Sequence, residues 1–269
     1  MRHVVIGNGN LGNSLADKLL KKGHSVRILS ASNGWKYPAD LLPIYDFVPE
    51  HVWVTVGAGS VEQAKINYLP FIDLHVRLIV DLVHNLNKNI SLHTFSSDYV
   101  IDKPEKSLYA LSKNYMENIL IATNKPKTYV YRVGSLYGVH KPQKCFPYKL
   151  KKNLVDAQKK GLEIKLPSNH ITPTPTDWVA DSVIHALNSL GEDFKIFNVA
   201  PMLCCKVQEW GELILQQPIK ENDFDYSRPI YSNIGCDLPT QIEQKSWLDL
   251  WKEREQSWQD ILNKIETPC

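Results

Sequence analysis

Residues 3–20 of the chain read HVVIGNGNLGNSLADKLL. A short β-branched run ends at residue 6, glycines follow at positions 7, 9 and 12, and apolar residues then recur at helical spacing. A strand, a glycine loop and a helix in this order form a dinucleotide-binding turn, in which the glycines allow a tight bend and close approach of the backbone to pyrophosphate. The N–H groups at the start of the helix attract the anion. The expected cofactor contacts are Gly7, Gly9, Asn10, Leu11 and Gly12.

The elements beyond the loop favour an α/β fold. Further strands are predicted at residues 25–29, 52–56, 89–95 and 128–133, with helices at 61–82 and 111–122 between them. Strands that alternate with helices indicate a doubly wound, Rossmann-like parallel sheet. Between residues 30 and 52 the helix and strand of a regular unit must be abbreviated, because that segment is short and contains Gly34 and Pro38.

The second half of the chain is less regular and predicts a smaller lobe. A basic helix is expected at residues 147–160, a helix at 177–190, a strand at 195–199 and a tail helix at 246–265 whose tryptophan stripe packs into the core. We therefore divide the chain into a nucleotide-binding domain, residues 1–140 completed by 177–200, and a substrate-binding lobe, residues 141–176 and 201–269.

Composition excludes several classes of function. A net charge of +2 on 269 residues provides no general field for nucleic acid or an anionic membrane. The five cysteines are odd in number and lack paired spacing, so neither a disulfide framework nor a metal site is expected. No apolar run reaches the roughly 20 residues of a membrane span, and a strand at residue 3 leaves no room for a signal peptide. We expect a cytoplasmic protein, and a homodimer is compatible with these features.

The end of the second strand bears on the choice of cofactor. An NAD-preferring site usually carries an acidic residue there, but residues 29–33 contain no carboxylate. The hydroxyls of Ser30 and Ser32, with Arg27 and Lys36 nearby, suit a 2′-phosphate. The pattern favours NADPH over NADH, although these side chains are also ordinary for a loop.

A tyrosine and a lysine, Tyr109 and Lys113, lie one helical turn apart and so on one face of a predicted helix. A lysine ammonium near a phenol lowers the tyrosine pKa towards neutrality and can reach the ribose of the nicotinamide nucleoside. The spacing alone is common and mostly structural. Its position is informative here, because it follows a strand that ends in Ser96 and Ser97, whose hydroxyls would emerge at the carboxyl edge of the sheet.

Taken together, these motifs resemble the extended short-chain dehydrogenase/reductases, in the nucleotide-sugar branch that includes the dTDP-4-dehydrorhamnose reductases. The resemblance covers most of the chain, and the order of the motifs is its strongest part. Besides the glycine loop and Tyr109/Lys113, it rests on Val56-Gly57-Ala58-Gly59, on SSDYV at 96–100, on RVGSLYG at 132–138, on ITPT at 171–174 and on SRPIYS at 227–232.

The resemblance implies an NADPH-dependent reduction of a 4-keto group on a nucleotide-activated deoxysugar. Tyr109 would be the general acid, Lys113 its electrostatic partner and a ribose ligand, and Ser97 the hydroxyl that orients the carbonyl, with Ser96 as its rival. Cofactor contacts are implied for Ser30, Gly57, Ala58, Gly59 and Val133, and substrate contacts for Ser96, Asp98, Phe146 and Arg228.

Two departures from the family pattern leave alternatives open. Only eleven residues separate Ser97 from Tyr109, and the acidic stretch after the strand at 52–56 is reduced to Glu62. One alternative is an epimerase or dehydratase that retains NAD and returns the hydride to the same sugar. Another is a cofactor-binding regulatory subunit without catalysis, although the intact set of Ser97, Tyr109 and Lys113 argues against it.

Overall fold

A six-stranded sheet forms the centre of the computed structural model, which describes residues 1–38, 41–57, 59–101, 107–222, 235–239 and 245–265. The strand order is β10-β5-β4-β3-β1-β2, and all neighbouring strands are parallel. This confirms the predicted Rossmann-like α/β class. The strands are β1 (Arg2–Ile6), β2 (Ser25–Leu29), β3 (His51–Val54), β4 (Ser91–Ser97), β5 (Thr128–Val133) and β10 (Lys195–Val199).

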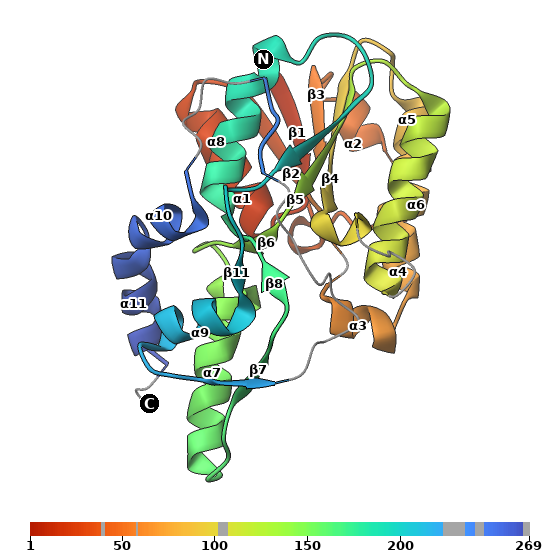
Figure 1. Ribbon diagram of the computed structural model, residues 1–269. Helices are drawn as coiled ribbons and strands as arrows, with labels where there is room; N and C mark the ends of the chain where they lie inside the picture. The colour runs from red at the N-terminus through yellow and green to blue at the C-terminus, as the bar shows by residue number, and fades with distance from the viewer. Residues whose placement is uncertain (39–40, 58, 102–106, 223–234, 240–244, 266–269) are drawn as a thin grey trace.

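Helices cover both faces of the sheet (Figure 1). One face packs against α1 (Asn10–Lys21) and α8 (Thr176–Ala186), and the other against α2 (Leu42–Tyr45), α5 (Leu78–Asn85) and α6 (Leu108–Thr123). Successive residues of a strand point to opposite faces, so Val5 and Trp53 belong to the first core while Val4 and Val52 belong to the second.

The helix expected at residues 61–82 is broken into shorter pieces. Ser60 caps α3 (Val61–Ile66), and the extended backbone of Asn67 ends it. Pro70 then begins α4 (Leu69–Ile72), because a proline lacks the N–H that a helix interior needs. A π-helical turn η2 (Asp73–Arg77) joins α4 to α5. The segment after β2 is abbreviated as expected, since it contains only η1 (Ala31–Asn33) and α2 before β3.

The second half of the chain builds a smaller lobe below the sheet (Figure 1). A cluster of aromatic side chains fills its core, in which Tyr137 contacts Trp210, Trp251 and Trp258. The predicted tail helix is two helices, and its tryptophan stripe is buried as expected. The helices are α7 (Phe146–Lys159), α9 (Val207–Leu215), α10 (Trp247–Lys252) and α11 (Glu255–Asn263).

Short strands and turns make up the remaining elements. They include β6 (Ser135–Tyr137), β7 (Lys165–Pro167), β8 (His170–Ile171), β9 (Pro173–Pro175), β11 (Cys205–Lys206), β12 (Lys220–Asn222), and the turns η3 (Asp98–Val100), η5 (Pro142–Lys144) and η6 (Leu187–Ser189). These strands pair as β6 with β9, β8 with β11 and β7 with β12.

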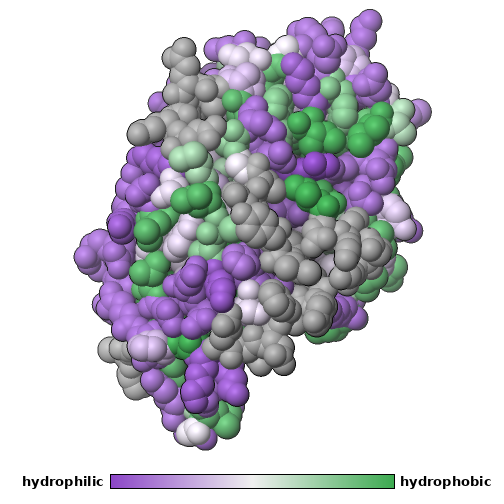
Figure 2. Space-filling view, viewed as in Figure 1, coloured by the Kyte–Doolittle hydropathy of each residue, from purple (hydrophilic) through white to green (hydrophobic). Residues whose placement is uncertain are grey.

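Within the described residues, no helix is both long and apolar enough to cross a membrane. On the face in Figure 2, hydrophobic side chains form several small groups between hydrophilic ones rather than one continuous band. The same residues contain no group of three or more histidine, cysteine, aspartate or glutamate side chains arranged to hold a metal ion.

Candidate active site

Two cavities lie at the carboxyl edge of the sheet, where the ends of parallel strands converge. The first, of about 480 Å³, is lined by the glycine loop and by residues that follow β2 and β3. The second, of about 470 Å³, is lined by residues at the ends of β4 and β5 and by α3, α6 and α7. Ser97 and Tyr109 therefore lie along the same edge as the predicted cofactor loop, in a neighbouring cavity that Lys113 does not line.

The glycine loop has the close contacts that its sequence predicts. Gly7 has a φ of +114°, and a Cβ there would lie 2.7 Å from the backbone nitrogen of Val56. A Cβ on Gly12 would lie 2.0 Å from the carbonyl oxygen of Gly7, so only glycine lets α1 start this close to β1. Thr55, which the sequence analysis did not single out, donates its Oγ1 hydroxyl to the carbonyl oxygens of Ile6 and Gly7, both at 3.1 Å.

The open side of this loop fits a dinucleotide. Gly9 precedes α1 and has no side chain that could accept from the first N–H groups of the helix, so an anion can take that place. A Cβ on Gly9 would meet no atom within 4 Å. Leu11 is buried in the core instead, and Asn10 bonds elsewhere, so these two predicted contacts can offer only backbone groups.

Ser30, Lys36, Tyr37 and Gly57 also line this cavity. Arg27 is turned away from it, since its guanidinium donates to the carbonyl oxygen of Pro43 at 2.8 Å and lies 4.6 Å from the centre of the Phe47 ring. Arg27 therefore does not join Ser30 and Lys36 as the sequence analysis expected. Ala58 lies outside the described residues, and Gly59 lines the neighbouring cavity.

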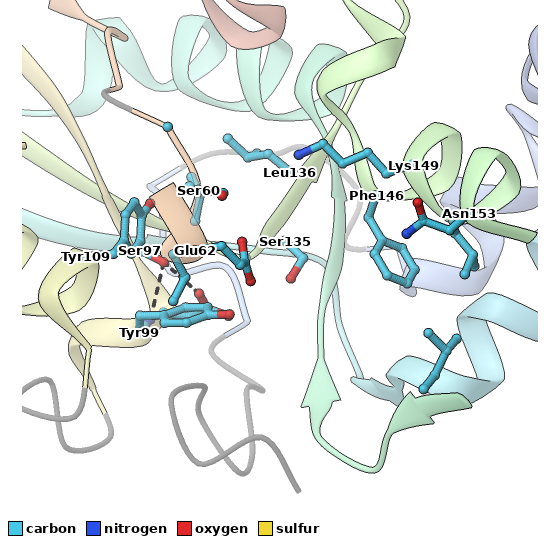
Figure 3. Close-up of a pocket in the computed structure, with 17 residues that line it drawn as sticks. Ser60, Glu62, Ser97, Tyr99, Tyr109, Ser135, Leu136, Phe146, Lys149 and Asn153 are labelled. Carbon is cyan, nitrogen blue, oxygen red and sulfur yellow. Dashed lines mark hydrogen bonds between the residues drawn. The ribbon is translucent and has the colours of Figure 1, made fainter. Parts of the chain in front are cut away.

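Ser97 and Tyr109 line the second cavity together, at the end of β4 and in the first turn of α6 (Figure 3). The Ser97 hydroxyl donates to Asp98 Oδ1 at 2.9 Å and accepts from the Tyr99 backbone N–H at 3.3 Å. It also lies close enough to the Tyr109 phenol to lower the pKa of that phenol. Lys113, one turn along α6, is buried and donates from Nζ to the carbonyl oxygen of Phe95 at 2.7 Å.

Burial sets the protonation of this pair. The pKa of Tyr109 is raised to about 12 by burial and by the Asp98 carboxylate, while the Ser97 hydroxyl lowers it. The pKa of Lys113 is lowered to about 7 by burial, against the raising effect of Glu117. The expectation that Lys113 brings the Tyr109 pKa towards neutrality is wrong here, because desolvation penalises the phenolate and the ammonium is directed at Phe95.

Aromatic rings surround Tyr109 on several sides. Phe71, His75 and Tyr99 meet its ring edge to face, with centroids 6.2, 6.0 and 5.8 Å away. His75 lies on the π-helical turn, and burial lowers its pKa well below the ordinary value. Its Nδ1 lies 2.9 Å from the Ser112 hydroxyl. The sequence analysis missed these neighbours because it predicted one continuous helix through residues 71–75.

The wall opposite Ser97 and Tyr109 comes from α7, whose Phe146, Lys149 and Asn153 face the cavity (Figure 3). Phe146 is one of the expected substrate contacts, whereas Asn153 was not expected. Among the residues at the end of β5, Val133 lines the same cavity.

Of the other predicted substrate residues that the structure describes, only Asp98 lines this cavity. Asp98 lines the cavity, but Ser96 is buried and does not, since adjacent residues of a strand point to opposite faces. Arg228 lies outside the described residues.

Comparison with known proteins gives no match by sequence and many by structure. No family model and no curated protein matches the chain. A dTDP-4-dehydrorhamnose reductase from Clostridium acetobutylicum has a TM-score of 0.76 at 19% identity, covering 98% of this chain and all of the other. The chain has the fold of the extended short-chain dehydrogenase/reductases. The same fold is seen in a Bacillus anthracis dTDP-4-dehydrorhamnose reductase in complex with NADP, with a TM-score of 0.72, 18% identity and coverage of 92% and 96%.

An epimerase shares this short-chain dehydrogenase/reductase fold to a similar degree. The UDP-glucuronic acid 4-epimerase from Bacillus cereus, in complex with UDP-glucuronic acid and NAD, has a TM-score of 0.74 at 14% identity and covers 97% of this chain and 100% of the other. Reductases and epimerases therefore match about equally well, and the fold alone does not separate the two reactions.

Proposed function

We propose that the protein reduces a 4-keto group on a nucleotide-activated deoxysugar with NADPH. One observation carries the proposal: Ser97 and Tyr109 line a cavity at the carboxyl edge of a Rossmann-like sheet, with Lys113 one turn along α6, and a glycine loop that fits a dinucleotide lines the neighbouring cavity. A sequence resemblance to the nucleotide-sugar reductases and a fold shared with them support it.

In this proposal a bound nicotinamide supplies the hydride, and the chain supplies the proton and the positioning. The Tyr109 phenol donates its proton to the oxygen of the substrate carbonyl as that oxygen becomes an alkoxide. Ser97, which lines the same cavity as Tyr109, orients the carbonyl oxygen towards the phenol. Lys113, whose ammonium donates to the Phe95 carbonyl oxygen, is the candidate ligand for the nicotinamide ribose.

The protonation of Tyr109 suits its proposed role as a proton donor. Burial and the Asp98 carboxylate raise its pKa to about 12, so the phenol is protonated at neutral pH. The reduction step of an epimerase needs the same proton donor, so the choice of reduction over epimerisation rests on the sequence resemblance and is tested by the consumption of NADPH.

The second cavity is suited to a nucleotide sugar. Its volume of about 470 Å³ lies within the range of small-molecule sites, and it extends from Tyr109 to α7. Phe146 can stack on a base and Lys149 can pair with a phosphate, so the sugar would lie at Ser97 and Tyr109 and the nucleotide at α7.

The decisive test replaces Tyr109 with phenylalanine. The purified protein would be mixed with NADPH and dTDP-, UDP- or GDP-linked 4-keto sugars, and NADPH oxidation followed by absorbance. We expect Tyr109→Phe to lower turnover roughly a hundredfold or more, because the proton donor is lost, with little change in NADPH affinity. Tyr115→Phe is the matched control on the same helix, since Tyr115 is 45% exposed and lies outside the cavity.

Three outcomes would contradict the proposal. Undiminished turnover in Tyr109→Phe would remove the tyrosine from its role. Conversion of a sugar without stoichiometric loss of NADPH would indicate an epimerase. Tight cofactor binding with no turnover on any of these sugars would indicate a regulatory subunit.

A further inference from the structure

We propose that Lys141 and Lys144, in the segment 138–145 that connects β6 to α7, bind the 2′-phosphate of NADPH, with Lys144 lining the cofactor cavity and Lys141 bonded to Asn8 of the glycine loop. The inference rests on the proposed function, since it assumes a nicotinamide dinucleotide in this cavity. It adds two specificity residues from a segment far from β2 in the chain.

Hydrogen bonds from Asn10 hold the segment 138–145 against the glycine loop. The Asn10 side-chain amide accepts from the Lys141 backbone N–H at 2.7 Å and donates to the Lys141 carbonyl oxygen at 3.0 Å. The same amide nitrogen donates to the Cys145 sulfur at 3.1 Å. At Gly138 a Cβ would lie 3.2 Å from Cβ of Asn10, so this segment passes directly against α1. The lysines are therefore held beside the loop by fixed backbone contacts.

A chain of hydrogen bonds runs from Lys141 to the end of β2. Lys141 Nζ donates to Asn8 Oδ1 at 3.0 Å, and the Asn8 amide donates to the Ser32 hydroxyl. Ser32 in turn lies 3.1 Å from the Ser30 hydroxyl. The residues at the end of β2 are those that meet the adenosine ribose in this fold class. Lys141 is thus connected to the position where a 2′-phosphate would lie.

The charge lining the cavity is predominantly positive. Lys144 lines it together with Ser30, Ala31 and Lys36. Its acidic lining residue, Asp73, already pairs with Arg77 at 2.7 Å. Neither Lys141 nor Lys144 forms an ion pair with any residue that the structure describes. Lys144 in the lining and Lys141 bonded to Asn8 provide two ammonium groups without an ion-pair partner among these residues on this side of the cavity, which suits the dianionic phosphate that distinguishes NADPH from NADH.

The test measures the dissociation constants of NADPH and NADH with the full-length protein by fluorescence titration. The variants are Lys141→Ala, Lys144→Ala and the double substitution. We expect the double variant to bind NADPH at least about tenfold more weakly, because charge-assisted hydrogen bonds are lost, and to bind NADH as before. Raising the salt concentration should weaken NADPH binding in the wild type and have much less effect in the double variant.

Lys160→Ala is the matched control, because Lys160 is an exposed lysine directly after the far end of α7. Equal weakening of NADPH and NADH would overturn the inference, since it would place the lysines on the pyrophosphate. Unchanged binding of both nucleotides would overturn it as well. A wild-type protein that binds neither nucleotide would refute the proposed function itself.

Discussion

Tyr109 and Lys113 show how burial acts oppositely on an acid and a base. Both side chains lie in α6 next to the core, and desolvation favours the neutral form of each. The tyrosine pKa therefore rises to about 12 and the lysine pKa falls to about 7. At neutral pH the phenol is a ready proton donor, whereas the lysine is close to its own midpoint.

This difference predicts a pH dependence for the proposed reduction. Above about pH 7 Lys113 loses its proton, and with it the positive charge proposed to hold the nicotinamide ribose, while Tyr109 stays protonated. We expect kcat/KM to fall as pH rises above 7, by up to about tenfold per pH unit, as for a single titrating group. Initial rates between pH 6 and 9.5 measure the profile.

Lys113→Arg tests the assignment, because a guanidinium keeps its charge over this whole range. The activity that Lys113→Arg retains should not fall as pH rises above 7. If kcat/KM of Lys113→Arg falls with the same midpoint as in the wild type, a group other than Lys113 causes the fall.

At the scale of elements, two glycines at the junction of β1 and α1, Gly9 and Gly12, have different roles. Gly12 has no room for a side chain because the Gly7 carbonyl would lie 2.0 Å from its Cβ, whereas Gly9 faces open space. Gly12 therefore allows β1 and α1 to pack closely. Gly9 leaves the N-terminus of α1 accessible to a ligand.

Alanine at each position should separate these roles. Gly12→Ala should lower the free energy of unfolding by about 1–3 kcal/mol and weaken NADPH binding, because α1 must shift away from β1. Gly9→Ala should change stability by less than about 1 kcal/mol while weakening NADPH binding, since its methyl group occupies the space for pyrophosphate. Urea denaturation and cofactor titration measure the two effects. Gly9→Ala with wild-type affinity would place the dinucleotide elsewhere.

At the scale of the whole molecule, a row of histidines crosses the central sheet. His3 stacks on His51 with ring centroids 4.8 Å apart, and His51 Nδ1 lies 3.0 Å from His93 Nε2. His93 Nδ1 lies 2.9 Å from the Tyr131 hydroxyl, and Trp53 donates its indole N–H to His3 at 3.1 Å. Burial lowers the pKa of His3 to about 3, of His51 to about 4 and of His93 well below the ordinary value.

These shifts predict a loss of stability in mild acid. The unfolded chain takes up protons below about pH 6.5, while the folded histidines resist protonation down to about pH 4 and 3. Their contribution is fully present above pH 6.5 and is lost as pH falls below it, by up to about 1.4 kcal/mol per pH unit and histidine. Urea denaturation at pH 7.5, 6 and 5 measures this slope. His51→Gln should reduce it, and the exposed His84→Gln should not.

Local patterns in the chain predicted most of the sheet and part of the site. Alternating strands and helices indicated the α/β class, and helical spacing placed Tyr109 and Lys113 on one face of α6. The broken segment at 61–85 was missed, although Pro70 was a signal for it. Ser96 was an undecided rival of Ser97 because the sequence does not show which face of β4 meets the cavity.

By itself, the sequence determined the glycine loop, the parallel sheet and the Tyr109/Lys113 pair, because each depends on the spacing of neighbouring residues. Only the tertiary structure decided that Lys141 and Lys144 lie beside Asn8, over 130 residues away in the chain, and that Arg27 does not. It also decided the direction of the Tyr109 pKa shift. Desolvation and long-range contacts depend on which segments pack together, and residue spacing does not reveal that.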